Sequence, residues 1–213
     1  MNNKKFCFIT CVNNQELYNE CLYYINNLNV PKGYEVEIFS IENAESIASG
    51  YNNAMRSSDA KYKIYLHQDV LLINKNVLYE IIDIFSDENI GMIGVCGSQV
   101  IGTDGAWWNA LDKYKFGKIY EYREYGLNHI QFSEINEKYK EVQAIDGVLM
   151  ITQYDIPWRE DIIDGWHFYD LTQSLEFIRN SYSVVVPKQN KAWCLHDSGL
   201  VSIDNLLILE KYY

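Results

Sequence analysis

Positive charge is scarce in this sequence. The 213 residues contain 18 Lys and Arg against 29 Asp and Glu, which gives a formal net charge of −11 at pH 7. A chain of this sign repels a nucleic-acid backbone and an anionic membrane surface. We therefore expect no nucleic-acid partner. An anionic small molecule would need a metal ion or a helix N-terminus to hold it.

Long apolar runs and paired cysteines are also missing. No window approaches the roughly 18 continuous apolar residues of a membrane-spanning helix. The apolar run at residues 6–12 stops at Asn13 without the cleavage site of a signal peptide. The five cysteines form no C-x-x-C pair and lack the dense spacing of secreted, disulfide-rich domains. We expect reduced thiols, with Cys7 and Cys11 on one buried strand face, no transmembrane segment, and a cytoplasmic protein.

What the sequence does contain is enough apolar surface for a folded core, because 48% of its residues are hydrophobic. Buried strands are predicted at residues 6–12 and 90–96, an alternating strand at 35–41 and a further strand at 61–66. An amphipathic helix is predicted at residues 15–28, and further helices at 44–56 and 77–85. This alternation indicates an open α/β sheet. Beyond residue 97 the pattern predicts loops and short antiparallel strands around 114–125, a strand-like segment at 142–152, a helix at 168–179 and a last strand at 183–186.

Polar residues follow three of the predicted strands, where open α/β sheets bind their ligands. Asn13 follows the first strand, Glu42 the second, and His67-Gln68-Asp69 the third. From spacing alone, turn or helix-cap chemistry explains Asn13 and Asn14 better than ligand binding does. Asp69 lies between two apolar runs, so it either binds a hard divalent ion together with diphosphate oxygens or caps the next helix.

Four later segments each have a chemical and a structural interpretation. Asp146-Gly147 either forms an ordinary turn, which we favour, or allows a ligand to approach closely. Asp170, in the first turn of a predicted helix, either interacts favourably with the helix dipole or acts as a general base. His196 either ligates a metal or, as we favour, bonds a backbone carbonyl. Trp107-Trp108 forms either an exposed stacking platform or part of the core.

In this order the segments resemble the nucleotide-diphospho-sugar glycosyltransferases of the GT-A fold, and most closely a short bacterial branch related to the large family-two group. The matching segments cover nearly the whole chain: residues 8–13, 48–54, 65–70, 90–95, 107–108, 146–150, 166–170 and 195–197. The resemblance implies a Rossmann-like, mostly parallel central sheet flanked by helices, with a small antiparallel portion on the acceptor side. It also implies a single domain over residues 1–213, with a nucleotide-binding half at 1–97 and an acceptor-side half at 98–213.

The resemblance implies roles for individual residues. Residues 67–69 stand where the family carries its D-x-D motif, with His67 in place of the first Asp, so Asp69 would bind Mn²⁺ or Mg²⁺. His196 matches a late histidine that completes metal binding, and Asp170 matches the base of inverting members, where Tyr169 replaces the preceding acid. The nucleotide-binding residues would be Thr10, Val12, Asn13, Glu42, Asn52 and Gln68. The sugar and acceptor side would be formed by Trp107, Trp108, Asp146, Gly147 and Trp166.

The implied activity is metal-assisted, inverting transfer of a sugar from a nucleotide-diphospho-sugar, most simply a UDP-sugar. The acceptor would be a saccharide, a lipid-linked saccharide or a protein. Two other functions stay open: a non-catalytic member of the fold that binds a sugar nucleotide, and a metal-dependent hydrolase built from His67, Asp69, Asp170 and His196. Because the chain is short for the family, a homo-oligomer or a partner could complete the acceptor site.

Overall fold

The computed structural model describes residues 1–124 and 126–199, and its larger sheet has seven strands. These strands are β1 (Asn2–Val12), β2 (Glu35–Glu42), β3 (Ala60–Leu66), β5 (Ile90–Gly94), β9 (Tyr139–Glu141), β11 (Leu149–Thr152) and β12 (Ser183–Pro187). Their order is β2-β1-β3-β11-β5-β12-β9. β1 pairs in parallel with β2 and β3, and β5 with β12, whereas β11 is antiparallel to both of its neighbours. The predicted α/β class is confirmed.

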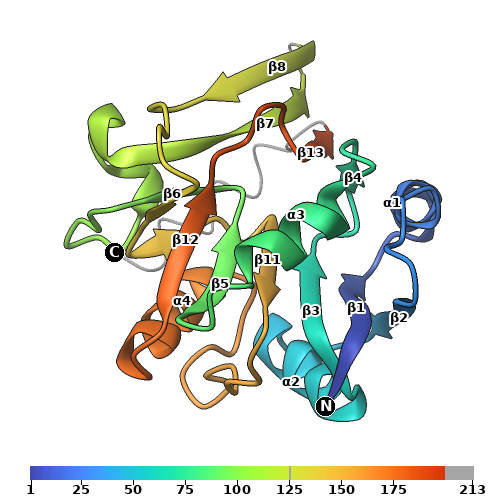
Figure 1. The fold of residues 1–213 in the computed structure, drawn as a ribbon. Coiled ribbons are helices and arrows are strands. Elements are labelled where there is room, and N and C mark those ends of the chain that lie inside the picture. Colours follow the sequence, from blue (N-terminus) through green and yellow to red (C-terminus); the bar gives the residue numbers. More distant parts are fainter. Residues whose placement is uncertain (125, 200–213) are drawn as a thin grey trace.

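A second sheet contains mainly antiparallel strands. It is formed by β4 (Val70–Leu72), β6 (Cys96–Ser98), β7 (Lys115–Arg123), β8 (Gly126–Gln131), β10 (Ala144–Ile145) and β13 (Cys194–Gly199). The order is β10-β6-β7-β13-β4, with β8 added to β7. In Figure 1 this sheet lies across the top of the molecule, and the arrows of β1, β3 and β12 point towards it. Both sheets take strands from before and after residue 97, and the end of the expected domain, residues 200–213, lies outside the described residues.

Helices cover both faces of the larger sheet. They are α1 (Gln15–Asn26), α2 (Ile47–Ser57), α3 (Val77–Ile84) and α4 (Tyr169–Arg179). On β1, Phe6 and Phe8 point into the core shared with α1 and α3, while Cys7 and Ile9 point into the core shared with α2 and α4. A strand buried on both faces needs apolar residues at every position, which explains the continuous apolar run in the sequence. No helix in the described residues is both long and apolar enough to cross a bilayer.

The cysteines follow the expectation from the sequence. All five are free thiols, and Cys11 is the one that is partly exposed. Cys7 and Cys11 face the same side of β1, against the core that contains α2. Burial raises the pKa of the Cys7 and Cys11 thiols to about 12, so both stay protonated at neutral pH.

Two predictions for the second half need correction. The strand-like segment at 142–152 is two strands in different sheets, since β10 pairs with β6 and β11 with β3 and β5. Between them Asp146 Oδ1 accepts a hydrogen bond from the Val148 N–H at 2.8 Å, a local turn that lets the chain change sheets. The tyrosine-rich segment is also more regular than expected, because β7 is nine residues long. An apolar pattern reports burial and says nothing of which sheet a strand joins.

Candidate active site

A pocket of about 290 Å³ lies at the C-terminal ends of β1 and β3. It is lined by Cys11, Val12, Asn13, Ile47, Tyr51, Leu66, His67, Gln68, Asp69 and Trp166. Its position is the one at which open α/β sheets bind ligands. Ile47 is the first residue of α2, so the positive end of that helix dipole also lies at the pocket.

Gln68 fixes the turn after β1. Its side-chain Oε1 accepts hydrogen bonds from the backbone N–H groups of Asn13 and Asn14 at 2.9 and 2.8 Å, and its Nε2 donates to Asn13 Oδ1 at 2.5 Å. Asn14 in turn caps α1 by accepting from the N–H groups of Glu16 and Leu17. The loops after β1 and β3 are therefore held together at the mouth of the pocket, and the predicted capping role of Asn14 is confirmed.

One group of side chains at the pocket has the composition of a metal site. Single ligand atoms of His67, Asp69 and His196 all lie within 4.8 Å of one another, and the described part of the chain contains no other such group. Asp69 and His196 meet because β13 pairs with β4, and the Asp197 N–H donates to the Asp69 carbonyl at 2.9 Å. The sequence assigned Asp69 and His196 as the metal ligands of a transferase and placed His67 at a metal only in the hydrolase alternative, whereas the structure brings all three together.

The residues fit a divalent ion. Asp69 Oδ1 is buried, lies 3.4 Å from His196 Nε2 and accepts no hydrogen bond from any described residue. A buried carboxylate oxygen without a hydrogen-bond donor is costly and calls for a partner. One carboxylate and two imidazoles are ligands that divalent transition metals accept. The cluster can therefore hold such an ion at the edge of the pocket.

The pKa values of His67, Asp69 and His196 are set by burial and by the interactions of these side chains with one another. Burial acts to raise the pKa of Asp69, but the neighbouring imidazole of His196 outweighs it and lowers that pKa overall. Burial acts to lower the pKa of His196, and Asp69 reverses the effect, so its pKa is raised. For His67, burial and the neighbouring His196 lower the pKa despite two nearby carboxylates. His67 is therefore neutral at pH 7 and keeps a lone pair.

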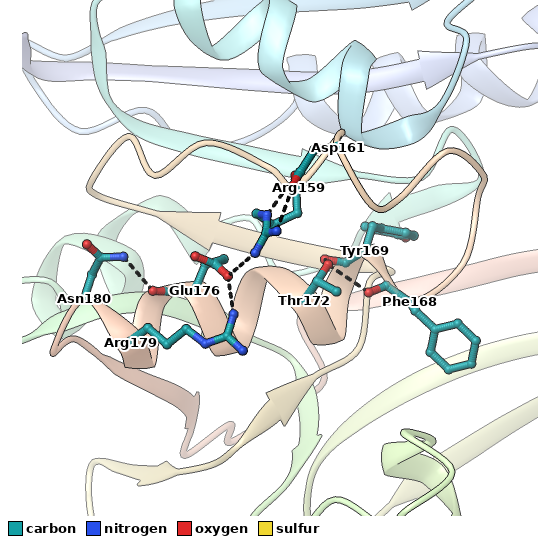
Figure 2. A network of polar contacts seen from close by, with 8 residues as sticks. All are labelled: Arg159, Asp161, Phe168, Tyr169, Thr172, Glu176, Arg179 and Asn180. Atoms are coloured by element: carbon teal, nitrogen blue, oxygen red, sulfur yellow. Dashed lines mark hydrogen bonds and ion pairs between the residues drawn. The ribbon is translucent and has the colours of Figure 1, made fainter.

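Tyr169, the first residue of α4, connects this cluster to that helix. Its hydroxyl lies 2.5 Å from His67 Nε2, and the residue is only 4% exposed. A Cβ atom at residue 147 would collide with the Tyr169 hydroxyl, so Gly147 is needed for the hydroxyl to fit. Figure 2 shows Tyr169 at the start of α4, with Phe168 before it pointing away from the helix. The group that approaches Gly147 closely is thus the Tyr169 side chain of the same chain.

Asp170 follows directly and has the properties of a proton acceptor. Its Oδ2 accepts from the Gly147 N–H at 3.2 Å and its Oδ1 from the Leu171 N–H at 2.8 Å. Burial and the nearby carboxylate of Asp146 raise the pKa of Asp170 to about 7, against the opposing effect of these N–H groups. A general base works best when its pKa lies near the working pH. Asp170 is therefore poised to take a proton at neutral pH.

The loop of residues 153–168 carries Trp166 to the pocket and is anchored at several points. Lys63, which is fully buried, donates to Asp155 at 2.7 Å. Figure 2 shows Arg159 reaching from the loop to Glu176 on α4, a contact of 3.1 Å. Beyond these anchors, the Gly165 carbonyl accepts from the Ile47 N–H at 3.3 Å. Trp166 itself is 49% exposed, so it borders the pocket as an open aromatic face.

Asn52 does not line the pocket. The sequence assigned it to nucleotide binding, but its side chain is buried and makes two hydrogen bonds with the backbone of Trp158. Its Nδ2 donates to the Trp158 carbonyl and its Oδ1 accepts from the Trp158 N–H, each at 2.9 Å. This amide is satisfied within the protein, so Asn52 anchors the 153–168 loop on α2.

Other predicted site residues lie apart from the pocket. Thr10 is buried within β1, and Glu42 is exposed at the end of β2. Trp107 is buried in the core against Phe132, whereas Trp108 is 53% exposed. The sequence reasoning missed Tyr51, which lines the pocket and whose buried hydroxyl has no partner among the described residues. Its helical spacing with Ile47 on the inward face of α2 was the available signal.

The sequence pattern of a family described as "Glycosyltransferase like family" matches residues 7–211. The chain belongs to this family. No curated protein matches it. Similar solved structures carry the same mixed α/β arrangement, so the glycosyltransferase-like chain has the GT-A fold.

Three solved structures illustrate the likeness. S. aureus TarS has a TM-score of 0.60 at 13% identity, over 91% of this chain and 36% of TarS. TarS 1-349 in complex with UDP-GlcNAc gives 0.61 at 13% identity, over 91% of this chain and 58% of that one. The mannosyltransferase PcManGT from Pyrobaculum calidifontis, in complex with GDP-Man and Mn²⁺, gives 0.59 at 11% identity, over 92% of this chain and 57% of that one. The glycosyltransferase-like chain thus spans about a third to three fifths of these proteins.

Proposed function

We propose that this chain transfers a sugar from a UDP-sugar to an acceptor hydroxyl with the help of a divalent metal ion. The observation that carries the proposal is the buried Oδ1 of Asp69, which accepts no hydrogen bond from the described residues and lies beside two imidazoles at the edge of a pocket. A net charge of −11 disfavours a diphosphate ligand, so a cation at this point is what makes such a ligand acceptable. The resemblance to structures solved with UDP-GlcNAc and with GDP-Man and Mn²⁺ supports this donor class.

The proposed donor site uses the two sides of the pocket differently. Asp69 and His196 hold Mn²⁺ or Mg²⁺, which when bound would stabilise the charge that develops on the diphosphate leaving group. Val12 and Ile47 form an apolar wall for the base, next to the turn of Asn13 that Gln68 fixes. Thr10, Glu42 and Asn52 are left out of the proposed donor site because none of them lines the pocket or belongs to the cluster of His67, Asp69 and His196.

Asp170 is the proposed catalytic base. The acceptor hydroxyl must lose a proton as it attacks the anomeric carbon, and a carboxylate within hydrogen-bond reach can take it, a contribution of ~10²- to 10⁴-fold. A base that activates an acceptor opposite the leaving group gives inversion of the anomeric centre. Asp146, Gly147, Trp108 and Trp166 would lie on the sugar and acceptor side, and Trp107 stays in the core. The acceptor is a saccharide, a lipid-linked saccharide or a protein.

The test is release of nucleoside diphosphate from a panel of UDP-sugars and GDP-mannose, with Mn²⁺ and with a chelator. We expect slow, metal-dependent release from at least one UDP-sugar, because water can replace the acceptor. Asp170→Asn should slow this release, whereas Asp112→Asn, at an exposed residue shortly before β7, should leave it unchanged. Donor binding without release under any condition would contradict the transferase proposal and favour a non-catalytic binding protein.

A further inference from the structure

The proposed function uses Asp69 and His196 as metal ligands and leaves His67 without a role. We propose that His67 is a third ligand through its Nδ1 atom, that Tyr169 positions it, and that the resulting site selects a first-row transition metal over Mg²⁺. This inference rests on the proposed metal-assisted function.

The two ring nitrogens of His67 have different surroundings. Its Nε2 lies 2.5 Å from the Tyr169 hydroxyl, so that nitrogen is occupied. The remaining nitrogen, Nδ1, is the one free to meet Asp69 and His196, and the His67 and His196 rings lie 5.6 Å apart. When Nε2 carries the proton and donates it to the tyrosine oxygen, Nδ1 keeps its lone pair. Metal-bound histidines generally use their second nitrogen in this way, which fixes the ring orientation.

The Tyr169 hydroxyl has little freedom to move away from His67 Nε2. The tyrosine ring packs against Tyr51 and Trp158, with ring centroids 6.1 and 6.2 Å away. On the other side, Gly147 lies directly against the Tyr169 hydroxyl, and a Cβ atom at residue 147 would overlap the hydroxyl oxygen. The backbone N–H of His67 is also bonded, to the Val148 carbonyl at 3.3 Å. The two residues are thus held against each other from both sides.

The three proposed ligands, one carboxylate and two imidazoles, favour some divalent metals over others. Mg²⁺ prefers oxygen ligands and gives up its waters reluctantly, so a site with two nitrogens among three protein ligands suits it poorly. First-row transition ions accept imidazole, and their affinities for one site rise from Mn²⁺ to Co²⁺. The expected order of affinity is therefore Co²⁺ above Mn²⁺ and Mn²⁺ above Mg²⁺. Replacing His67 by Asp should bring the Mn²⁺ and Mg²⁺ affinities closer together.

The test is direct binding of Mn²⁺ alone to the full chain, followed by electron paramagnetic resonance, with pulsed measurements that detect nitrogen bound to the ion. We expect couplings from two imidazoles in the parent and from one in His67→Asp. Tyr169→Phe keeps the ring but removes the hydroxyl, and it should weaken Mn²⁺ binding about 10- to 100-fold. The matched control is Tyr139→Phe, which removes a hydroxyl bonded to Asp87 at 3.0 Å, outside the pocket, and should leave Mn²⁺ binding unchanged.

A second variant guards against a folding defect in Tyr169→Phe. Gly147→Ala leaves both His67 and Tyr169 in the chain but pushes the hydroxyl away, so it should weaken Mn²⁺ binding in the same direction. A single bound imidazole in the parent, or Mn²⁺ affinity unchanged in Tyr169→Phe, would overturn the inference while metal-dependent UDP binding would still support the proposed function. If the parent bound neither Mn²⁺ nor UDP, both would fail.

Discussion

The carboxylate of Asp170 accepts a hydrogen bond from the backbone N–H of Gly147 at 3.2 Å, which fixes the first turn of α4 to the turn that joins the two sheets. The same glycine makes room for the hydroxyl of Tyr169, the residue before Asp170. One turn therefore sets the position of the proposed base and of the contact to His67. Because both side chains start from adjacent residues of α4, movement of this helix end would disturb proton transfer and metal binding together.

The pH dependence of turnover should report the ionisation of Asp170. Its pKa is raised to about 7 by burial and by Asp146, and a general base acts only when it is ionised. We expect kcat to fall about tenfold per pH unit below about pH 7 and to level off above it. The measurement is a pH–rate profile at saturating donor and metal, with UDP binding followed at the same pH values. A kcat that is constant across this range while UDP stays bound would contradict the assignment.

Asp146→Asn should move that profile to lower pH. The Asp146 carboxylate raises the pKa of Asp170, so removing its charge lets Asp170 ionise more readily. Asparagine keeps an oxygen that can accept from the Val148 N–H, which preserves the local turn. The check is the midpoint of the acidic limb in the variant against Asp112→Asn as the control. An unchanged midpoint would mean that Asp146 does not act on the ionising group.

Asp170→Asn should lose activity and gain stability. The pKa of Asp170 is higher in the folded chain than in the unfolded one, so its ionised form destabilises the fold. This penalty is absent below about pH 4 and complete above about pH 7, so stability falls as pH rises between them. At about pH 8 the variant should be more stable by on the order of 1–2 kcal/mol, with the gain vanishing near pH 4. Urea unfolding at both pH values tests this, and a loss of stability at the higher pH would contradict it.

Gln68→Ala should weaken donor binding with little effect on the fold. The change removes all three hydrogen bonds that hold the turn of Asn13 and Asn14 at the pocket. Water can replace these bonds because the turn is exposed, so the expected loss of stability is only about 1 kcal/mol. UDP affinity should fall about tenfold, equivalent to about 1.4 kcal/mol. Gln15→Ala removes a side-chain contact at the start of α1 and is the matched control, so equal losses in both variants would refute a special role for Gln68.

Asp155→Asn should destabilise the chain because it leaves the Lys63 ammonium buried without its counter-charge. Breaking a buried pair costs ~3–5 kcal/mol, and since Asp155 is 35% exposed we expect about 2 kcal/mol. The control is Glu160→Gln, at another residue of the same loop. It breaks an exposed ion pair with Arg56 of α2 and should cost less than about 1 kcal/mol. Denaturant unfolding compares the two. Equal costs would show that the Lys63 pair does not anchor the 153–168 loop.

The parts of the fold that could be predicted from the sequence are those set by local patterns. The apolar run of β1 shows a strand buried on both faces, and the spacing in α1 and α2 marks helices with one inward side. Position after a predicted strand was also enough to indicate Asn13, Gln68 and Asp69, which line one pocket. These inferences depend only on the period of each element and on the rule that ligands meet the ends of strands.

The contacts that could not be predicted join residues far apart in the chain. His67 and Tyr169 are 102 positions apart, and Asn52 and Trp158 are 106 apart. No local sequence pattern marks either pair, because a buried polar residue can bind a ligand or another part of the protein equally well. Glu42 does not line the pocket for a related reason, since β2 ends at the edge of the sheet.

Calorimetric titration of UDP tests the central claim, a metal-dependent nucleotide site at Asp69 and His196, most directly. The titration would be made into the parent chain with Mn²⁺, into the parent with a chelator, and into Asp69→Ala with Mn²⁺. We expect UDP to bind in the first case and to lose its binding in the other two. UDP binding of equal strength in all three, or none in any, would contradict the claim.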